Sequence, residues 1–191
     1  MVLEYYEDHI EYDELLKALE PYVQENGLHN QGAGIFMRER GYNTLFAHHD
    51  LGVLSPEIEN ITEKDIDRLK EVFEAIPNDE QNAYRREKLA LDIRYIEAGG
   101  FYSTTFPTLE LVDGYLAQNI PVILGAVRNK GLHLNPTAGD GNHAIMVVGK
   151  EGDYYHVNDP SPNSEREYKI HKDRLLHAWY NSGAQMRVAW K

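Results

Sequence analysis

The sequence predicts an α+β fold in which helices come first and an antiparallel sheet follows. Residues 1–118 contain several stretches with apolar side chains three and four positions apart, which is the spacing of amphipathic helices. Residues 119–191 instead contain short apolar runs that are rich in β-branched residues and separated by turn signals, which indicates strands. No internal repeat or low-complexity segment interrupts this order. We therefore expect one domain over residues 1–191, with a mainly helical part (1–118) and a mainly sheet part (119–191).

Composition and charge exclude several classes of partner. The 191 residues are 42% hydrophobic and 26% charged, as in an ordinary soluble globular domain. The formal net charge is −12, from 31 acidic and 19 basic residues, and such a chain repels nucleic-acid phosphates and anionic lipid surfaces. No apolar run reaches the roughly 20 residues that cross a bilayer, and the acidic N-terminal stretch is unlike a secretory signal. We expect a cytoplasmic protein that binds neither nucleic acid nor membranes.

The chain contains no cysteine, which excludes disulfides, thiolate metal sites and a cysteine nucleophile within these residues. His48, His49 and Asp50 form a cluster whose residue types suit a metal. Adjacent residues on an extended segment point to opposite faces, however, so they make poor co-ligands. No glycine-rich phosphate loop is found either. We expect no metal site and no cofactor.

The helical part begins at the start of the chain. Residues 1–7 carry apolar groups without a capping residue in front, so a helix begins abruptly there. Over residues 12–23 the apolar positions repeat at three and four, which predicts an amphipathic helix with one buried stripe that Pro21 bends or ends. Residues 31–40 predict a third short helix, closed by Gly41 at its C-terminal end.

The middle of the chain changes from a short strand to long helices and then to a loop. Residues 44–47 predict the strand. Residues 55–99 are strongly helical and charged, with two amphipathic faces, and Gly99–Gly100 ends the second helix. The segment FYSTTFPT (101–108) predicts an aromatic loop rich in hydroxyls. Its last residue, Thr108, is expected to cap a helix over the residues that follow.

The sheet part is read from apolar runs of strand length. Strands are predicted at residues 121–127 (PVILGAV), 143–150 (HAIMVVGK), 154–159 (YYHVND), 168–170 and 186–190. The Glu151–Gly152–Asp153 turn joins the second and third of them as a tight hairpin. Residues 172–180 predict a helix, and we assign Trp179 and Trp190 to the core.

Two residues in the sheet part suggest chemistry. His143 opens one predicted strand and Asp159 closes the next, so antiparallel pairing through a tight hairpin brings them to the same edge of the sheet. An imidazole held by a carboxylate is the base-and-orienter half of a nucleophilic triad. The alternative is that His143 only starts a strand and Asp159 only caps a turn with Pro160.

The order of these motifs resembles a known family. A helix is followed by a Pro-Val-Ile strand (120–124), by GNHAIMVVG (141–149), by VNDP (157–160) and by LLHAW in a late helix (175–179). This order resembles the bacteriocin-processing, double-glycine-leader type of bacterial cysteine peptidase, in the papain-like superfamily. Residues 1–19 also resemble the back half of that family's catalytic helix and the helix after it.

The resemblance implies a papain-like α+β fold, with N-terminal helices packed on a C-terminal antiparallel sheet. It also implies that His143 is the general base and Asp159 its orienter. In the family the nucleophilic cysteine lies about two helical turns before the position of Met1, and an oxyanion-hole glutamine lies further upstream. This chain contains neither residue at a matching position. A histidine–aspartate pair without a thiol has nothing to deprotonate.

Three explanations follow for the missing nucleophile. The chain is a cysteine-free relative that binds peptides without cutting them, which is the explanation we favour. Alternatively, it is an N-terminally truncated form of an active thiol peptidase, amide hydrolase or transferase. The third explanation is that a separate chain supplies the nucleophile. Whether the chain is an enzyme therefore stays open, and as written it is expected to be inactive as a thiol peptidase.

Three further residues are candidates for contacting a substrate. They are Tyr102 in the aromatic loop, His133 in the glycine-rich loop and Asn142 beside His143. Each also has a purely structural interpretation, as part of a packed connection or a loop. The expected partner is a peptide or protein segment. A second copy or another chain could also occupy the site of the missing N-terminal segment, because an exposed apolar groove favours association.

Overall fold

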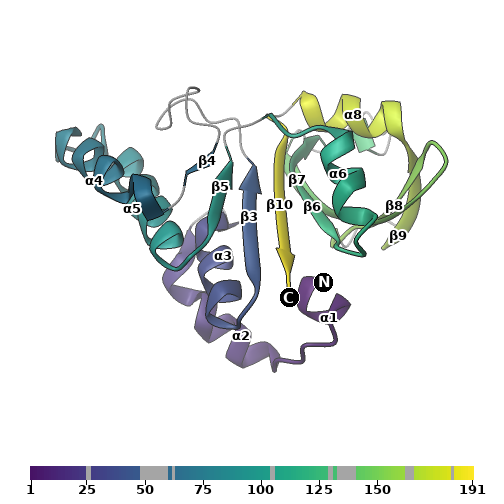
Figure 1. Cartoon of the computed structure of the whole chain (residues 1–191), viewed down its shortest axis with the longest axis horizontal. Helices are drawn as coiled ribbons and strands as arrows, with labels where there is room; N and C mark the ends of the chain where they lie inside the picture. The colour runs from purple at the N-terminus through teal and green to yellow at the C-terminus, as the bar shows by residue number, and fades with distance from the viewer. Residues whose placement is uncertain are drawn as a thin grey trace. The chain divides into compact units, whose positions relative to one another are not determined.

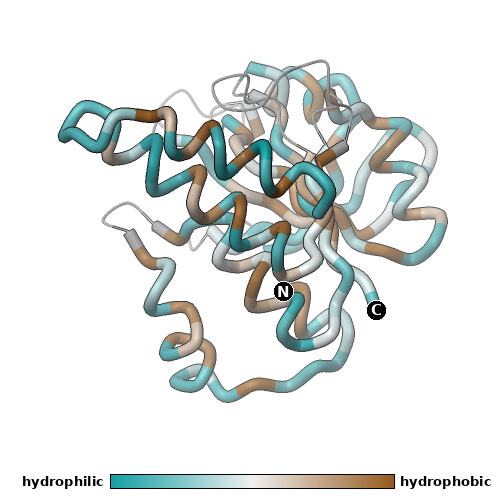
Figure 2. The backbone as a smooth tube through the Cα atoms, turned by 60° about the vertical axis from the view of Figure 1, so that its left-hand side comes forward, coloured by the Kyte–Doolittle hydropathy of each residue, from teal (hydrophilic) through white to brown (hydrophobic). Residues whose placement is uncertain are grey.

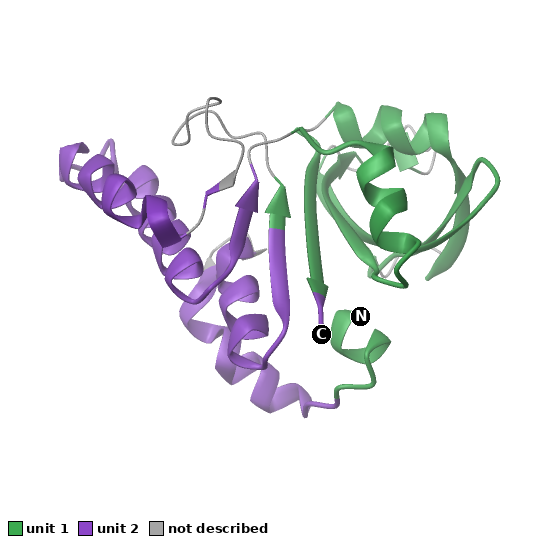
Figure 3. Ribbon diagram, viewed as in Figure 1, with its two compact units in different colours: residues 1–8, 46–49, 105–189 green, residues 9–45, 50–104, 190–191 purple. Residues whose placement is uncertain are grey.

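The computed structural model describes residues 1–24, 27–47, 60–61, 63–103, 106–128, 131–132, 141–161, 166–181 and 183–191. The fold is α+β, as predicted. Two compact units make up the chain (Figure 3): unit 1 comprises residues 1–8, 46–49 and 105–189, and unit 2 comprises residues 9–45, 50–104 and 190–191. The predicted boundary at residue 118 falls inside unit 1.

Unit 1 is built on an antiparallel sheet with the strand order β10-β6-β7-β8-β9 (Figure 1). The strands are β6 (Val122–Arg128), β7 (Asn142–Glu151), β8 (Tyr154–Asn158), β9 (Glu167–His171) and β10 (Gln185–Trp190). Each overlaps a predicted strand to within a residue or two at either end, because the apolar runs that mark them supply side chains to the core. β6 lies between two neighbours, which agrees with its continuous apolar sequence.

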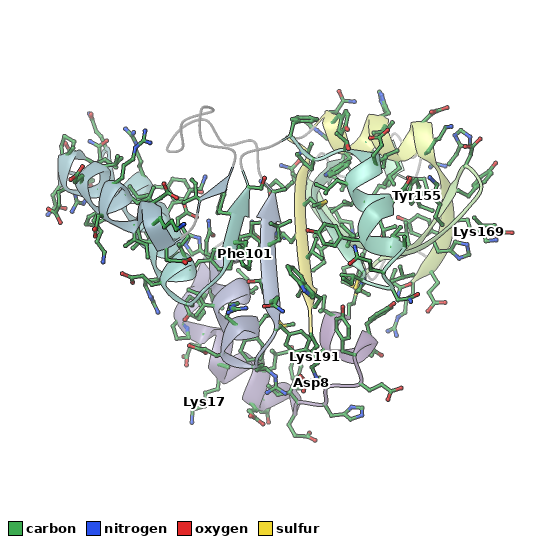
Figure 4. All side chains as sticks on the ribbon, in the orientation of Figure 1. Asp8, Lys17, Phe101, Tyr155, Lys169 and Lys191 are labelled. Atoms are coloured by element: carbon green, nitrogen blue, oxygen red, sulfur yellow. The ribbon has the colours of Figure 1, made fainter. Side chains whose placement is uncertain are left out.

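Helices of unit 1 pack on this sheet. They are α1 (Val2–Tyr5), α6 (Leu109–Leu116) and α8 (Lys172–Tyr180). The Thr108 side chain accepts the Leu111 N–H at 3.3 Å, so the predicted N-terminal cap of α6 is confirmed. Trp179 on α8 is fully buried, as predicted. α6 is also tied to the sheet, because the Tyr155 hydroxyl donates to the Asp113 carboxylate at 2.7 Å (Figure 4).

α1 is fastened by its two tyrosines. The Tyr5 hydroxyl donates to the Asn119 carbonyl at 3.1 Å, and the Tyr6 hydroxyl, just past the helix, donates to the Ala189 carbonyl at 3.0 Å. A helix of four residues has little stability of its own. These two bonds to the backbone of unit 1 therefore hold it in place.

Unit 2 contains most of the predicted helices. Its helical elements are α2 (Tyr12–Leu19), the 3₁₀ turn η1 (Glu20–Tyr22), α3 (Asn30–Glu39), η2 (Glu63–Asp65), α4 (Ile66–Ala75) and α5 (Ala83–Glu97). Its strands are β1 (Val23–Gln24), β2 (Gly27–Leu28), β3 (Asn43–Ala47), β4 (Asn60–Ile61) and β5 (Phe101–Ser103). As predicted, the first long helix ends at the turn that contains Pro21, and α3 ends just before Gly41, whose φ is +84°.

Buried polar bonds join α3 to α5 in unit 2. The Gln31 amide donates to the Asp92 carboxylate at 2.6 Å, and Asp92 is only 2% exposed. His29, which is also buried, lies 3.2 Å from the Glu87 carboxylate. Burial raises the pKa of Asp92 to about 6, although the Gln31 hydrogen bond and the nearby Lys88 oppose the shift.

Three sequence predictions about packing are wrong. No residue of α2 is buried, so its apolar stripe is not a core stripe. Residues 101–103 form strand β5 and not a loop, because they pair with β4. Trp190 is half-buried, because it is the last residue of β10 and lies at the end of that strand. Among the described residues, no helix is both long and apolar enough to cross a membrane.

Candidate active site

The position of His143 is set by the pairing of β7 with β6. β6 carries a bulge between Leu124 and Val127, where Ala126 has a φ of +55°, and beyond the bulge Val127 pairs with His143. A bulge bends its strand and changes the direction of the side chains near it, and bulges are common beside active sites. The position of His143 at the start of β7 therefore depends on the bulge in β6 as well as on the sequence of β7 itself.

Asp159 follows directly after β8. β7 and β8 pair antiparallel through the predicted hairpin, with Met146 opposite Asn158. This register brings the residue after β8 back to the end of β7 that carries His143. The Asp159 N–H donates to the Arg166 carbonyl at 2.8 Å, which fixes the backbone where the chain leaves the sheet.

The two side chains meet, as the sequence predicted. The His143 Nε2 atom lies 2.5 Å from the Asp159 Oδ1 atom. The side chain of Asp159 is completely buried, and that of His143 is 16% exposed. The Asp159 carboxylate is thus closed to solvent, whereas the His143 imidazole is partly exposed. Its catalytic role stays a prediction.

Asp159 is held as a carboxylate by several donors. Oδ1 also accepts the Ser161 N–H at 2.8 Å, and Oδ2 accepts the Tyr168 hydroxyl at 3.2 Å. Burial alone raises the pKa of Asp159, but the Ser161 N–H, His143 and Tyr168 outweigh it, and the pKa lies below its usual value. Burial and the Asp159 charge raise the pKa of Tyr168, so this hydroxyl stays a donor.

This arrangement fixes which nitrogen of His143 is available. An ionised carboxylate at Nε2 requires a proton on that atom, so the neutral ring carries its lone pair on Nδ1. Among the described residues, Nδ1 has no hydrogen-bond partner. The pair can therefore accept a proton at Nδ1, or hydrogen-bond a ligand there. Thiol chemistry needs a cysteine, and these 191 residues contain none.

A pocket of about 530 Å³ lies against Asp159. It falls within the size range of ordinary ligand sites. α1 contributes one wall, and the ends of β8 and β9 contribute the other. The lining residues are Met1, Glu4, Tyr5, Met146, Asn158, Asp159, Pro160, Arg166 and Glu167. Both apolar and charged residues therefore line this space.

The other predicted site residues do not gather around the pair. Asn142 is exposed at the first position of β7, and because neighbouring strand residues alternate, it points away from the face of His143. Tyr102 is 3% exposed in β5 of unit 2, where burial argues against contact with a ligand. His133 lies outside the described residues, as does the His48–His49–Asp50 cluster. No group of three metal-ligating side chains forms in the part of the chain that the structure describes.

Sequence reasoning missed two residues of the site. The Asp-Pro-Ser sequence could have indicated Ser161, because an aspartate often accepts the N–H two residues further on. Tyr168 gave no such signal. It reaches Asp159 because β9 pairs with β8, with Tyr168 opposite Val157, and that register depends on the tertiary fold.

Comparison with known proteins gives a family. The family model described as Peptidase_C39 like family matches residues 1–187. No curated protein matches. Among solved structures, the chain is similar to a Bacillus anthracis protein described as a C39-like peptidase, with 14% sequence identity and a TM-score of 0.34. That similarity covers 44% of this chain and 48% of the other. The chain therefore spans about half the length of this solved relative. The family match extends over nearly the whole chain and agrees with the resemblance seen in the sequence motifs, and the chain therefore belongs to the Peptidase_C39 like family.

Proposed function

We propose that these residues form a peptide-binding domain of the C39-like type that does not cleave its ligand by thiol chemistry. One observation carries the proposal: an ionised Asp159 holds His143 at 2.5 Å in a chain without cysteine. A buried carboxylate is costly, and the donors around it keep it charged. Such a carboxylate is useful where it orients an imidazole toward a bound group.

The ligand is a peptide or protein segment. The pocket beside Asp159 offers apolar walls from Tyr5 and Met146, and Asn158 adds an amide that suits a peptide backbone. His143 does not line this pocket, and its Nδ1 atom is a separate acceptor behind which Asp159 lies. With a net charge of −12, the chain also favours ligands that are not acidic.

Binding of a selected peptide tests this function. A random-peptide phage library is panned against the purified chain, and an enriched peptide is synthesised with a fluorophore. We expect saturable binding that His143→Ala weakens by about tenfold or more, since it removes a directed contact. His9→Ala is the matched control, because this histidine is exposed in unit 2. If no peptide is retained, or both variants bind alike, the proposal is wrong.

A second candidate is that the 191 residues belong to a longer, active thiol peptidase. The intact geometry of His143 and Asp159 favours it, because this pair would activate a thiol without rearrangement. Translation of the DNA upstream of Met1 tests this candidate. The upstream DNA would have to encode, in frame, a glutamine followed by a cysteine. If the longer protein then hydrolyses peptides and His143→Ala abolishes this hydrolysis, the chain is part of a thiol peptidase and the binding proposal is wrong. A stop codon directly upstream would reject the longer form.

A further inference from the structure

The apolar stripe of α2 has one covered edge and one open edge. Tyr12, Leu15, Leu16 and Leu19 lie on one side of the helix, because residues three and four apart share a face. Leu15 and Leu19 are half-buried, and α2 packs on α3. Tyr12 and Leu16, by contrast, are 70% and 48% exposed. Figure 2 shows the apolar positions of α2 among hydrophilic ones.

The open edge of α2 consists of two exposed apolar side chains, Tyr12 and Leu16, and not of a single one. Tyr12 and Leu16 are four apart, so their side chains are neighbours on consecutive turns and form a continuous apolar strip. Single exposed apolar residues are normal on any protein, but a strip with polar borders is typical of a surface that another helix covers. The folding of unit 2 does not account for the strip, because no residue of α2 is buried.

Acidic side chains border this strip. With about 100° per residue, Asp13 and Glu20 fall next to Leu16 on one side, and Glu11 falls next to Leu15 on the other. All three are exposed. Lys17 is the only basic residue of α2, and it lies about 100° from Leu16, beyond Asp13 and Glu20. A partner that fits the open edge is therefore apolar where it meets Tyr12 and Leu16 and basic where it meets Asp13 and Glu20.

We propose that the open face of α2, formed by Tyr12 and Leu16 with the acidic border Asp13 and Glu20, docks a basic amphipathic helix of another polypeptide. A second copy of this chain fits poorly, because it would bring acidic borders against each other and its net charge is also −12. The face lies wholly in unit 2, whereas His143 and Asp159 lie in unit 1. The inference therefore does not depend on the proposed function.

The test uses a synthetic helix of about 18 residues, made of leucine and lysine at helical spacing. A second peptide replaces every lysine by glutamate. Binding to the full chain is measured by fluorescence anisotropy at low and high salt. We expect the lysine peptide to bind, the glutamate peptide not to bind, and the affinity to fall as salt rises.

Variants locate the binding face. Tyr12→Gln with Leu16→Gln should lower the affinity by about tenfold or more. Tyr84→Gln is the matched control, because Tyr84 is a 65% exposed tyrosine on another helix of unit 2, and it should leave binding unchanged. If the apolar double variant fails to fold, Asp13→Asn with Glu20→Gln replaces it and should reduce both affinity and salt dependence.

Several results would overturn the inference. The lysine and glutamate peptides could bind equally well, Tyr84→Gln could lower the affinity as much as the α2 variants do, or neither α2 variant could lower it. Sedimentation of the chain without peptide supplies a further test. A dimer that dissociates in the Tyr12→Gln, Leu16→Gln variant would assign the face to a second copy instead.

Discussion

At the scale of single residues, two buried aspartates show opposite behaviour. Asp159 is surrounded by donors and its pKa lies below the usual value, whereas Asp92 has a pKa raised to about 6 because burial dominates. Asp159 therefore stays charged to lower pH than an ordinary aspartate, whereas Asp92 takes up a proton near pH 6. Each difference makes the free energy of unfolding depend on pH, with opposite sign.

For Asp159, the stabilising contribution belongs to the charged form. Because its folded-state pKa is lowered, the contribution is fully present above the unfolded pKa of about 3.9 and is lost as pH falls through the folded pKa. We expect Asp159→Asn to lower the free energy of unfolding at pH 7 by about 1–3 kcal/mol. Urea unfolding at several pH values should show this deficit shrinking in acid. A deficit that stays constant down to the lowest pH, or one shared by the exposed Asp173→Asn, would contradict it.

For Asp92, the charged form is the destabilising one. Its folded-state pKa is raised, so its contribution is fully present below the unfolded pKa of about 3.9 and is lost as pH rises through about 6. Asp92→Asn keeps an oxygen for Gln31 and should raise the free energy of unfolding at pH 7.5 by about 1–3 kcal/mol, with no gain near pH 4. Urea unfolding at the two pH values measures this. Loss of stability at pH 7.5 would show that the Asp92 charge supports the α3–α5 contact.

At the scale of elements, the β7–β8 hairpin decides whether the site forms at all. It brings Asp159 back to His143, and its turn depends on Gly152, whose φ is +58°. Side chains other than glycine are strained in that region. The site therefore depends on a turn at the far end of both strands.

We expect Gly152→Ala to lower the free energy of unfolding by about 1 kcal/mol through strain alone, because no atom lies within 4 Å of the added methyl group. Gly114→Ala is the matched control. It adds the same methyl group to an equally open position inside α6, where alanine favours the helix, and should stabilise by about 0.5–1 kcal/mol. Thermal unfolding of both variants tests the pair. Equal shifts in the same direction would refute the strain argument.

The sequence predicted elements better than it predicted their burial. The apolar run of β6 and the Thr108 cap are local signals, and both were confirmed. The periodicity of α2 identified its apolar face correctly, but periodicity cannot tell whether another element covers that face. Residues 101–103 were assigned to a loop because aromatic and hydroxyl residues suit both states, and only pairing with β4 decides.

At the scale of the whole molecule, a family assignment over nearly the whole chain accompanies a histidine–aspartate pair without a cysteine in these residues. The His143–Asp159 contact was predictable because a hairpin and two strand ends are local in sequence. The support from Tyr168 was not, since it depends on the register of β9 with β8. The family assignment covers residues 1–187, and a cysteine is found nowhere in the 191 residues. The family match and the lack of a cysteine in these residues both support the proposal that the chain binds peptides without cleaving them by thiol chemistry.

Mass spectrometry of a bound peptide tests that claim most directly. A peptide selected by the chain is incubated with it, recovered from the complex and compared with the same peptide kept in buffer. We expect the peptide to be recovered intact from the wild-type chain, and less of it to be recovered from His143→Ala because binding is weaker. New fragments that appear with the wild-type chain and disappear with His143→Ala would contradict it, because the pair would then be catalysing cleavage.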